Sequence, residues 1–485
     1  MKAFPALSAP HRRGPVWLAA IATLALAGCA STAIDENYQG VRQITQQRLG
    51  AEVRWLTSDD ARQQAQTEVD ALLGKPLGAD DAVRIALAYS PSLQAMLYEG
   101  AARSAAATQS ARLPNPVFAF ERLVRNEGGS RELEITRTLS LSILDLILLP
   151  TRLRVAEFQQ QSTRLSLASN VVQAATMARQ AWISAVAAQQ SVQYFEQVKA
   201  SADASAELAR RMQAVGNYSK LQRAREQAFS AEAVTQLARG RQAARSSREA
   251  LVRALGLNEA QAAALVLPER LPDLPGTAQD EGVVTRAAMD QRLDVRLARA
   301  NLDFTAREQG LTRISSFVNG LELGLVSLSE SGEGTYKGFD IDVPLPIFDF
   351  GDAVREGSRA TYMAAVYRTA QLAVDARSRV RESYGVYRTA YDVSRHYRDE
   401  IVPLRRAIAD ENLLRYNGML IGVFELLADA REQVTSVVQA IEAQRDFWLA
   451  DAALQGALIG TPMNTTSMAG ESGSSTASRA NAAGH

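Results

Sequence analysis

Residues 338–360 read GFDIDVPLPIFDFGDAVREGSRA, and this stretch decides the fold. It begins with apolar residues that alternate with two aspartates, which is the two-residue period of a strand with one apolar and one polar face. Pro344, Pro346 and Gly351 then break the alternation, and a long helical pattern without proline follows. The stretch therefore predicts a strand, a hinge at these three residues and a helix of unusual length.

The composition excludes several classes of function. Basic and acidic side chains balance at 53 each over 485 residues, which argues against a general nucleic-acid binder. The three histidines are His11, His396 and His485, so only one could serve an interior site, and it lies in a charged run typical of a solvated helix face. No His cluster for a metal and no Ser-His-Asp set is expected. We therefore expect no catalytic residues, no metal and no cofactor.

The single cysteine, Cys29, follows a short apolar run at residues 16–27 that is too short to span a bilayer. A basic start, this run and the sequence LAGC at 26–29 are typical of a secretory signal peptide. Its end resembles the lipobox of bacterial lipoproteins, in which the peptide is cut before the cysteine and the cysteine carries acyl chains. An ordinary signal peptide with an incidental cysteine is the alternative. Lipid on Cys29 and a location outside the cytoplasm are expected.

Beyond this leader the chain is predicted to contain two similar halves. A shift of 202 residues superimposes the alternating segment 139–143 on 341–345 and Gly216 on Gly418. Solenoid repeats have periods of only about 20–50 residues, so the pattern indicates a duplicated half-protein. The predicted organisation is a signal peptide (1–28), an N-terminal extension (29–76), a first repeat (77–266), a Pro-rich linker (267–280), a second repeat (281–462) and a disordered tail rich in Ser, Gly and Ala (463–485).

Each half is predicted to hold one β-hairpin. The first joins strands at 117–124 and 131–143 through a Gly-rich turn, and the second joins strands at 321–328 and 339–345 through residues 329–334. Phenylalanines gather in and beside these hairpins, which suits the aromatic girdle of a membrane barrel, but two hairpins on a soluble core explain the alternation equally well.

Arg137 favours the soluble alternative, because it lies on the apolar face of the first hairpin. A charge that faces lipid costs about 2–4 kcal/mol in the middle of the membrane and little near its surface.

A long helical pattern follows each hairpin. Residues 152–215 would form a helix of about 90 Å, which no compact core can bury. Paired antiparallel helices with coiled-coil packing are therefore expected, with the chain reversing direction at two helix-tip turns. These turns are predicted at Gly216 and Asn217, and at Gly418, Met419, Leu420 and Gly422.

Several motifs together resemble the TolC-type outer-membrane efflux proteins over residues 77–462. They are LPNP (113–116), GNYSKLQRAREQA (216–228), VPLPIFDFGDAVR (343–355) and RYNGMLIGVFELLADAREQ (415–433). The resemblance implies a mainly α-helical fold with a small β part. In it, three chains each give four strands to one shared transmembrane β-barrel, and the long helices continue as an α-barrel. Four strands cannot close alone, because membrane barrels start at about eight strands.

The implied function is the exit duct of a tripartite efflux or secretion system, located in the outer membrane and extending into the periplasm. The implied partners are two further copies of the chain, a periplasmic adaptor that docks at the helix-tip turns, an inner-membrane pump and outer-membrane lipid; no nucleic acid is expected. The alternative is a lipid-anchored periplasmic helical scaffold that does not span the membrane.

One departure from the family pattern concerns the second turn. Family members commonly carry an aspartate directly before the alanine of a Leu-Asp-Ala motif, whereas the acidic residues here are Glu425 and Asp429. These two share a helix face, so a trimer would carry a ring of carboxylates near the periplasmic tip. An inward-facing ring would favour cations. The alternative is a solvated pair on an outer face, stabilised by Arg431 and its neighbours.

Overall fold

A computed structural model describes residues 29–127, 130–282, 292–315, 320–331, 334–345 and 347–460. The chain divides into two compact units. Unit 1 comprises residues 1–41, 98–164 and 297–369, and unit 2 comprises 42–97, 165–296 and 370–485. Both units contain residues from both proposed halves of the sequence. The bounds of the compact units therefore differ from the bounds of the predicted repeats.

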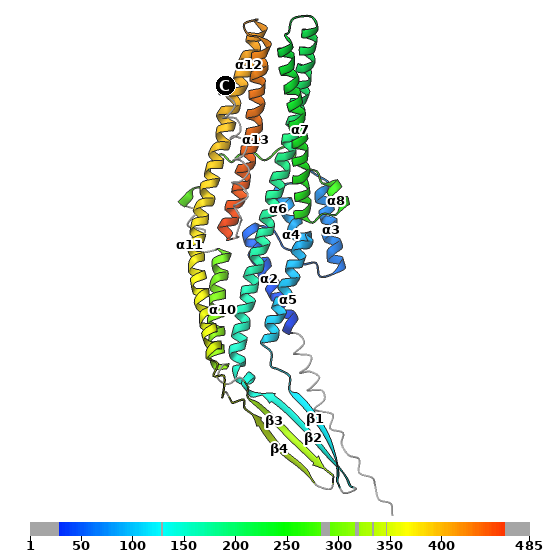
Figure 1. The fold of residues 1–485 in the computed structure, drawn as a ribbon, viewed down its shortest axis with the longest axis vertical. Helices are drawn as coiled ribbons and strands as arrows, with labels where there is room; N and C mark the ends of the chain where they lie inside the picture. Colours follow the sequence, from blue (N-terminus) through cyan, green and yellow to red (C-terminus); the bar gives the residue numbers. More distant parts are fainter. Residues whose placement is uncertain are drawn as a thin grey trace, which may run out of the picture. The chain divides into compact units, whose positions relative to one another are not determined.

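The described residues are mainly α-helical with one four-stranded sheet, as predicted (Figure 1). In chain order the elements are α2 (Cys29–Leu49), α3 (Asp59–Leu73), α4 (Ala79–Tyr89), α5 (Pro91–Ser110), β1 (Val117–Glu127), β2 (Ser130–Ser142), α6 (Ile143–Ala214), α7 (Lys220–Leu255), α8 (Glu259–Ala264), α10 (Leu293–Ser315), β3 (Glu322–Glu330), β4 (Thr335–Asp342), α11 (Asp352–His396), the π-helix η1 (Tyr397–Ile401), α12 (Val402–Asn417) and α13 (Val423–Ile459).

None of the helices within the described ranges is both long and apolar enough to cross a membrane.

The sheet of unit 1 is antiparallel throughout, in the order β1-β2-β3-β4. Its register confirms the predicted alternation, because one cross-strand row joins Phe118, Leu139, Leu325 and Phe339. All four side chains are exposed, between 47% and 71%. The unit thus presents a broad apolar sheet face that it does not itself cover.

The predicted bounds of the last strand are wrong, and proline explains where this strand ends. The last strand was expected at 339–345 but β4 is Thr335–Asp342, ending before Pro344, which has no N–H to donate to a ladder. Two helices are also divided at a proline, because α4 ends at Tyr89 and α5 begins at Pro91. The residue before a proline is disfavoured in the helical conformation, so the chain bends at Ser90.

The predicted hinge after β4 is present around Gly351. This glycine has a φ of 70°, in the left-handed region that favours glycine, and its N–H donates to Asp349 Oδ1 at 2.8 Å. Helix α11 begins at the next residue. Pro344 packs near the backbone of Gly320, and Pro346 lies outside the described residues. After β2 no such loop exists, because α6 starts at Ile143 and contains Pro150.

The core of unit 2 forms around the buried Trp182 of α6, whose indole N–H donates to the Leu77 carbonyl at 2.7 Å. The predicted linker 267–280 lies against this unit and is held by side chains rather than by regular structure. Its backbone receives or gives hydrogen bonds with Gln190, Tyr384, Tyr387, Tyr391, Gln444 and Trp448. The tyrosines are spaced three and four residues apart, so one face of α11 carries all three.

Pro403 explains the π-helix η1. Proline has no N–H for the carbonyl four residues earlier, and its ring crowds that carbonyl. Just before Pro403 the helix therefore takes the wider π form, in which the N–H of Val402 donates to the carbonyl of Tyr397, five residues earlier. The helix thus continues into α12 in spite of the proline.

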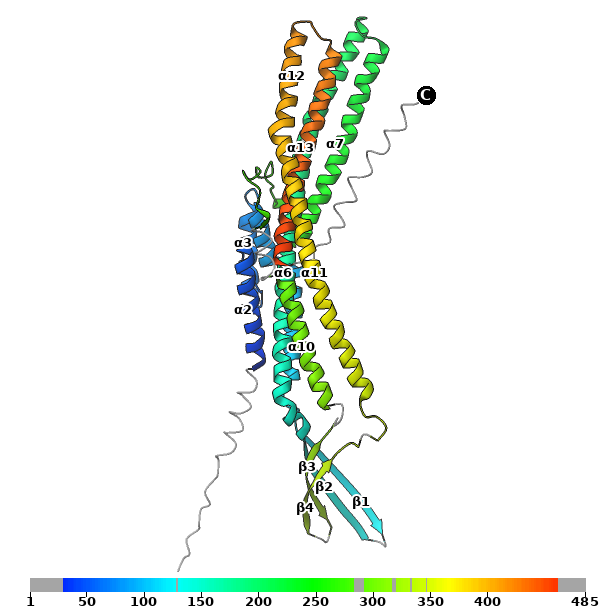
Figure 2. The same ribbon diagram turned by 90° about the vertical axis from the view of Figure 1, so that its left-hand side faces the viewer.

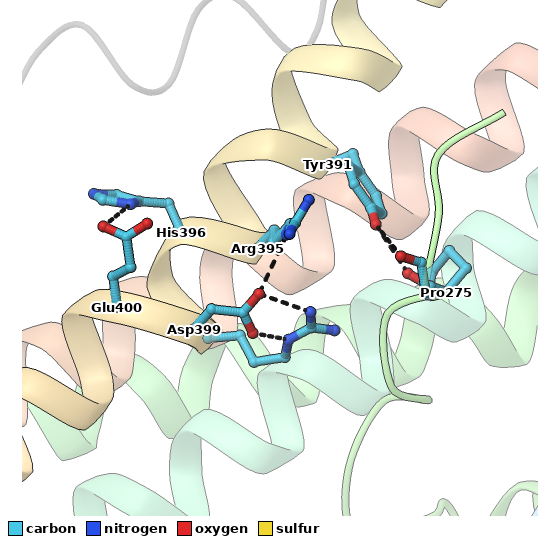
Figure 3. A network of polar contacts seen from close by, with 8 residues as sticks. Pro275, Tyr391, Arg395, His396, Asp399 and Glu400 are labelled. Atoms are coloured by element: carbon cyan, nitrogen blue, oxygen red, sulfur yellow. Dashed lines mark hydrogen bonds and ion pairs between the residues drawn. The ribbon is translucent and has the colours of Figure 1, made fainter. Parts of the chain in front are cut away.

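The polar residues around this point lie on a solvated helix face, as predicted for His396 (Figure 3). His396 Nδ1 lies 3.2 Å from the Glu400 carboxylate, and both side chains are more than half exposed. Arg395 pairs with Asp399 at 3.2 Å, while Tyr391 points the other way and donates to the Pro275 carbonyl.

Candidate functional site

Unit 2 contains two helical hairpins, α6–α7 and α12–α13, whose turns lie at the same end of the unit in both views (Figures 1 and 2). These turns fall where the glycine-containing segments predicted them. They carry most of the candidate site residues, so their construction decides what the site can do.

The first turn is capped at both of its helix ends. The N–H of Asn217 donates to the Met212 carbonyl at 2.9 Å, five residues back, which is the bond of a Schellman cap with Gly216 in the left-handed position at φ 84°. Ser219 and Gln222 then form a capping box that starts α7. Asn217 itself is exposed.

The second turn has the same backbone plan with different residues. The N–H of Leu420 donates to the Arg415 carbonyl at 2.9 Å, but the left-handed position is Met419, at φ 58°. Gly418 has a φ of −79°, so the expected match of Gly216 with Gly418 is wrong by one residue. Gly422 is the N-cap of α13 and provides no side-chain cap. Met419 and Leu420 are 93% and 78% exposed.

The two predicted acidic residues lie at the start of α13 in different surroundings. Glu425 is exposed in the first helical turn, where a carboxylate interacts favourably with the helix dipole. Asp429 is half-buried and accepts a hydrogen bond from Asn412 of α12. Within the described chain Arg431 forms an ion pair with Glu226 and with neither of these two residues, so the alternative interpretation does not gain the stabilisation by Arg431 that it assumed.

Arg431 instead joins the two hairpins. Its guanidinium pairs at 3.0 Å with Glu226 of α7 and lies over the Phe229 ring at 4.3 Å. Glu226 is only 2% exposed and also accepts from Ser205 Oγ at 2.7 Å. A carboxylate this buried is stabilised as an ion only because both partners face it.

The sequence carried a signal for this contact. The tetrapeptide AREQ occurs after both turns, at 224–227 and 430–433. The structure pairs the glutamate of the first copy with the arginine of the second. The other glutamate, Glu432, forms an exposed ion pair with Arg405 of α12 at 3.1 Å.

Tyr218 of the first turn is buried close to the same cluster. Burial, and then the negative charge of Glu226, raise the pKa of its hydroxyl, so it stays protonated at physiological pH. The first turn therefore carries a buried, neutral aromatic anchor, whereas the equivalent residue of the second turn, Ile421, is an aliphatic residue that is only partly buried.

The predicted lipid attachment residue, Cys29, is the first residue of α2, and its side chain lies outside the described part of the chain. Helix α2 is fixed within unit 1 by Asn37, which donates to Ser104 Oγ at 2.9 Å and accepts from Arg164 Nε at 3.1 Å. Cys29 is thus eight residues from a buried polar anchor.

In the ranges that the structure describes, no three His, Cys, Asp or Glu side chains come together in a way that could hold a metal ion. The turns carry exposed apolar side chains, which can bind a protein, and carboxylates, which can attract cations.

No protein-family model matches the sequence, and no curated protein matches it either. Solved structures match well in fold. The Campylobacter jejuni CmeC outer membrane channel superimposes with a TM-score of 0.67 over 79% of this chain and 85% of that chain, at 14% identity. The outer membrane protein VceC from Vibrio cholerae matches at 0.65, over 83% and 99%, at 14% identity. The Neisseria gonorrhoeae MtrE outer membrane channel matches at 0.63, over 78% and 88%, at 16% identity.

These similarities confirm the predicted TolC-type fold. At such low identity they carry the fold and not the function.

Proposed function

We propose that this protein is an outer-membrane exit duct, through which a pump and a periplasmic adaptor release their substrate. One observation carries the proposal. The four-stranded sheet has an exposed apolar face and an exposed polar face, and its outer strands β1 and β4 have free edges within the described chain. Such a sheet is stable only if its edges are paired and its apolar face leaves water. Two further copies and a surrounding lipid phase satisfy both needs.

In this proposal the polar face lines the passage. It carries glutamates, aspartates, threonines and serines, whose side chains favour a water-filled interior. The hinge around Gly351 then directs the chain from the sheet into α11, which continues the wall of the duct.

The helix-tip turns are the proposed docking surface for the adaptor. Exposed apolar side chains are concentrated there, with Met419 and Leu420 at the second turn and Val215, next to Gly216 and Asn217, at the first. Exposed apolar clusters of this kind mark protein-interaction sites. Replacing Met419 and Leu420 by serine should weaken adaptor binding in a pull-down from cells while the trimer in detergent remains intact.

Topology is tested by cysteine labelling with a membrane-impermeant reagent in intact cells. Gly334→Cys, in the loop of the second hairpin where an added Cβ meets open space, should react, whereas Asn217→Cys at the first helix-tip turn should not. Both positions are exposed, so burial does not explain the difference. Equal labelling, or release by carbonate without detergent of a variant that lacks Cys29, would favour the lipid-anchored scaffold.

Glu425 and Asp429 are the proposed acidic ring at the narrow end. In planar bilayers the double variant Glu425→Gln and Asp429→Asn should lose part of the cation preference of the wild type. Unchanged selectivity would place both residues outside the passage.

Lipid on Cys29 is tested by mass spectrometry of the mature N-terminus. We expect cleavage before Cys29 and acyl chains on it, and Cys29→Ser should block both. An unmodified cysteine, or a cut elsewhere, contradicts the proposed anchor.

A further inference from the structure

The two faces of the sheet carry charge of opposite sign. Among the strand residues whose side chains are described, the apolar face holds the bases Arg122, Arg137 and Lys337 and no acid. The polar face holds one base, Arg125, and the acids Glu121, Glu132, Glu134, Glu322, Glu330, Asp340 and Asp342. The apolar face therefore attracts anions, and no acidic side chain described on it neutralises its cations.

The three bases of the apolar face lie together. The register places Arg137 opposite Phe120 on one side and Ser327 on the other, and Ser327 opposite Lys337. Arg122 lies one row farther toward the hairpin turns, opposite Ile135. All three basic side chains are exposed, and none forms an ion pair within the described chain. Although they lie in two adjacent cross-strand rows, we call Arg122, Arg137 and Lys337 together the basic row.

From the basic row toward the hinge, the same face is apolar. The next rows are Phe118, Leu139, Leu325 and Phe339, and then Leu141, Leu323 and Ile341. The apolar surface continues beyond the strands, because Ile147, Leu345 and Phe348 are 63%, 73% and 99% exposed.

This order fixes the sheet's position in a membrane, given the proposed function on which it rests. If the basic row lay at the middle of the hydrocarbon, its cations would be desolvated, and the apolar residues around the hinge would remain in water. With the basic row at the outer boundary, the cations reach the headgroups, and the apolar band extends from the Phe118 row to the hinge.

We propose that the basic row binds phosphate groups of the lipids in the outer leaflet. Guanidinium and ammonium groups on an exposed face without acids are complementary to phosphate, which the two arginines can bind with paired hydrogen bonds. Phe120 beside Arg137 fits the aromatic girdle at a membrane boundary. The surface would select lipids by their phosphates and hold the trimer at one depth.

The test uses the purified full-length mature protein in detergent, titrated with lipopolysaccharide, with the same lipid after removal of its phosphates, and with phosphatidylglycerol. The wild type should bind intact lipopolysaccharide about 10- to 100-fold more tightly than the dephosphorylated form. The triple variant Arg122→Gln, Arg137→Gln and Lys337→Gln should lose this preference. The control Arg239→Gln, Arg245→Gln and Arg253→Gln removes three exposed arginines of α7 and should keep it.

Three results would overturn the proposal. They are a triple variant that binds like the wild type, a wild type indifferent to the phosphates, and phosphatidylglycerol bound as tightly as lipopolysaccharide, which would remove the assignment to the outer leaflet. External labelling of Gly334→Cys, measured in the wild-type and triple-variant backgrounds, separates this proposal from the proposed function. A labelled chain without phosphate preference contradicts only the basic row, whereas an unlabelled wild type contradicts the duct itself.

Discussion

The two helix-tip turns follow one backbone plan but are supported very differently. The first has glycine in its left-handed position, a capping box and a buried tyrosine. The second has methionine in that position, no side-chain cap at Gly422 and two of the most exposed apolar residues of the chain. A non-glycine residue in this conformation costs about 1–2 kcal/mol. The second turn should therefore open locally more often than the first.

The second hairpin contacts the first through the ion pair of Arg431 with Glu226, and Val434 of α13 packs against the apolar cluster of Val198, Ala202 and Ala233. The comparison is therefore between a turn that is stable by itself and a turn that depends on its neighbour. The changes described next test this difference in order of decreasing expected effect, and the control Arg405→Met is placed beside the variant that it controls.

Arg431→Met should have the largest effect, because it leaves the carboxylate of Glu226 buried with Ser205 as its remaining partner. We expect a loss of about 2–3 kcal/mol, somewhat less than for a fully buried pair because Arg431 is 35% exposed. Hydrogen exchange should accelerate over α13 more than over α7. The double variant Glu226→Leu and Arg431→Met should recover most of the loss.

Arg405→Met provides the matched control for this variant. It removes the exposed ion pair with Glu432, one residue along from Arg431, and should cost less than about 1 kcal/mol. Equal effects of the two arginine variants would mean that burial of Glu226 is unimportant.

Exchanging the left-handed residues tests the backbone cost alone. At Gly216 an added Cβ meets nothing within 4 Å, so Gly216→Met should lose about 1–2 kcal/mol without any steric clash. Met419→Gly should slow hydrogen exchange at the second turn, by a gain of up to about 1 kcal/mol. If neither exchange changes local opening, the left-handed positions do not explain why the turns differ.

Removing the N-cap side chain of α7, or adding one to α13, should have a smaller effect on stability. Ser219→Ala removes the capping box of α7 and should cost about 1 kcal/mol. Gly422→Ser should stabilise α13 by about a few tenths of a kcal/mol, which is the usual difference between serine and glycine as the N-cap. The new serine would complete a capping box, because Glu425 already occupies its third helical position. We expect amide hydrogen exchange in the first turn of α7 to become faster in Ser219→Ala, and exchange in the first turn of α13 to become slower in Gly422→Ser.

A fall in pH should have the smallest effect on stability, and we follow it on the first hairpin, which contains Asp203. Hydrogen bonds from Lys199 and Ser230 lower the pKa of Asp203, and Ser230 lies on α7 while Asp203 lies on α6. A lowered folded-state pKa contributes stability above the unfolded value, and this contribution disappears as the pH falls through the folded value. The loss should therefore begin below about pH 4, and Asp203→Asn should reduce it in an acid titration followed by hydrogen exchange over 199–230. Part of the loss should remain, because hydrogen bonds from Arg210 and Arg211 lower the pKa of Glu207 in the same segment to about 2.

Much of the fold was readable from the sequence because strand and helix periods are local. The two hairpins, the hinge at Gly351 and the positions of both turns follow from alternation and from glycine and proline. The start of β4 was missed, since Thr335, Lys337 and Gly338 show no alternation of apolar and polar residues. There the pairing with β3 decides, and pairing is not local.

The candidate site was less predictable for the same reason. That Glu226 meets Arg431 depends on how two hairpins pack, about two hundred residues apart in sequence, and a repeated tetrapeptide does not say which copies touch. Likewise, the left-handed residue of the second turn is Met419 and neither of the glycines beside it, and only the hydrogen bond of Leu420 shows where α12 ends.

The hydrogen bonds of the linker at 267–280 have a consequence for its resistance to proteases. Exposed proline-rich connections are usual cleavage sites, because a protease must draw the backbone into an extended conformation. Here the carbonyls of Pro272, Pro275, Gly276 and Gln279 are each held by a tyrosine or tryptophan side chain. The segment that joins the two halves of the sequence is thus protected by aromatic side chains of α11 and α13, and a protease can reach it only after those helices have separated from it.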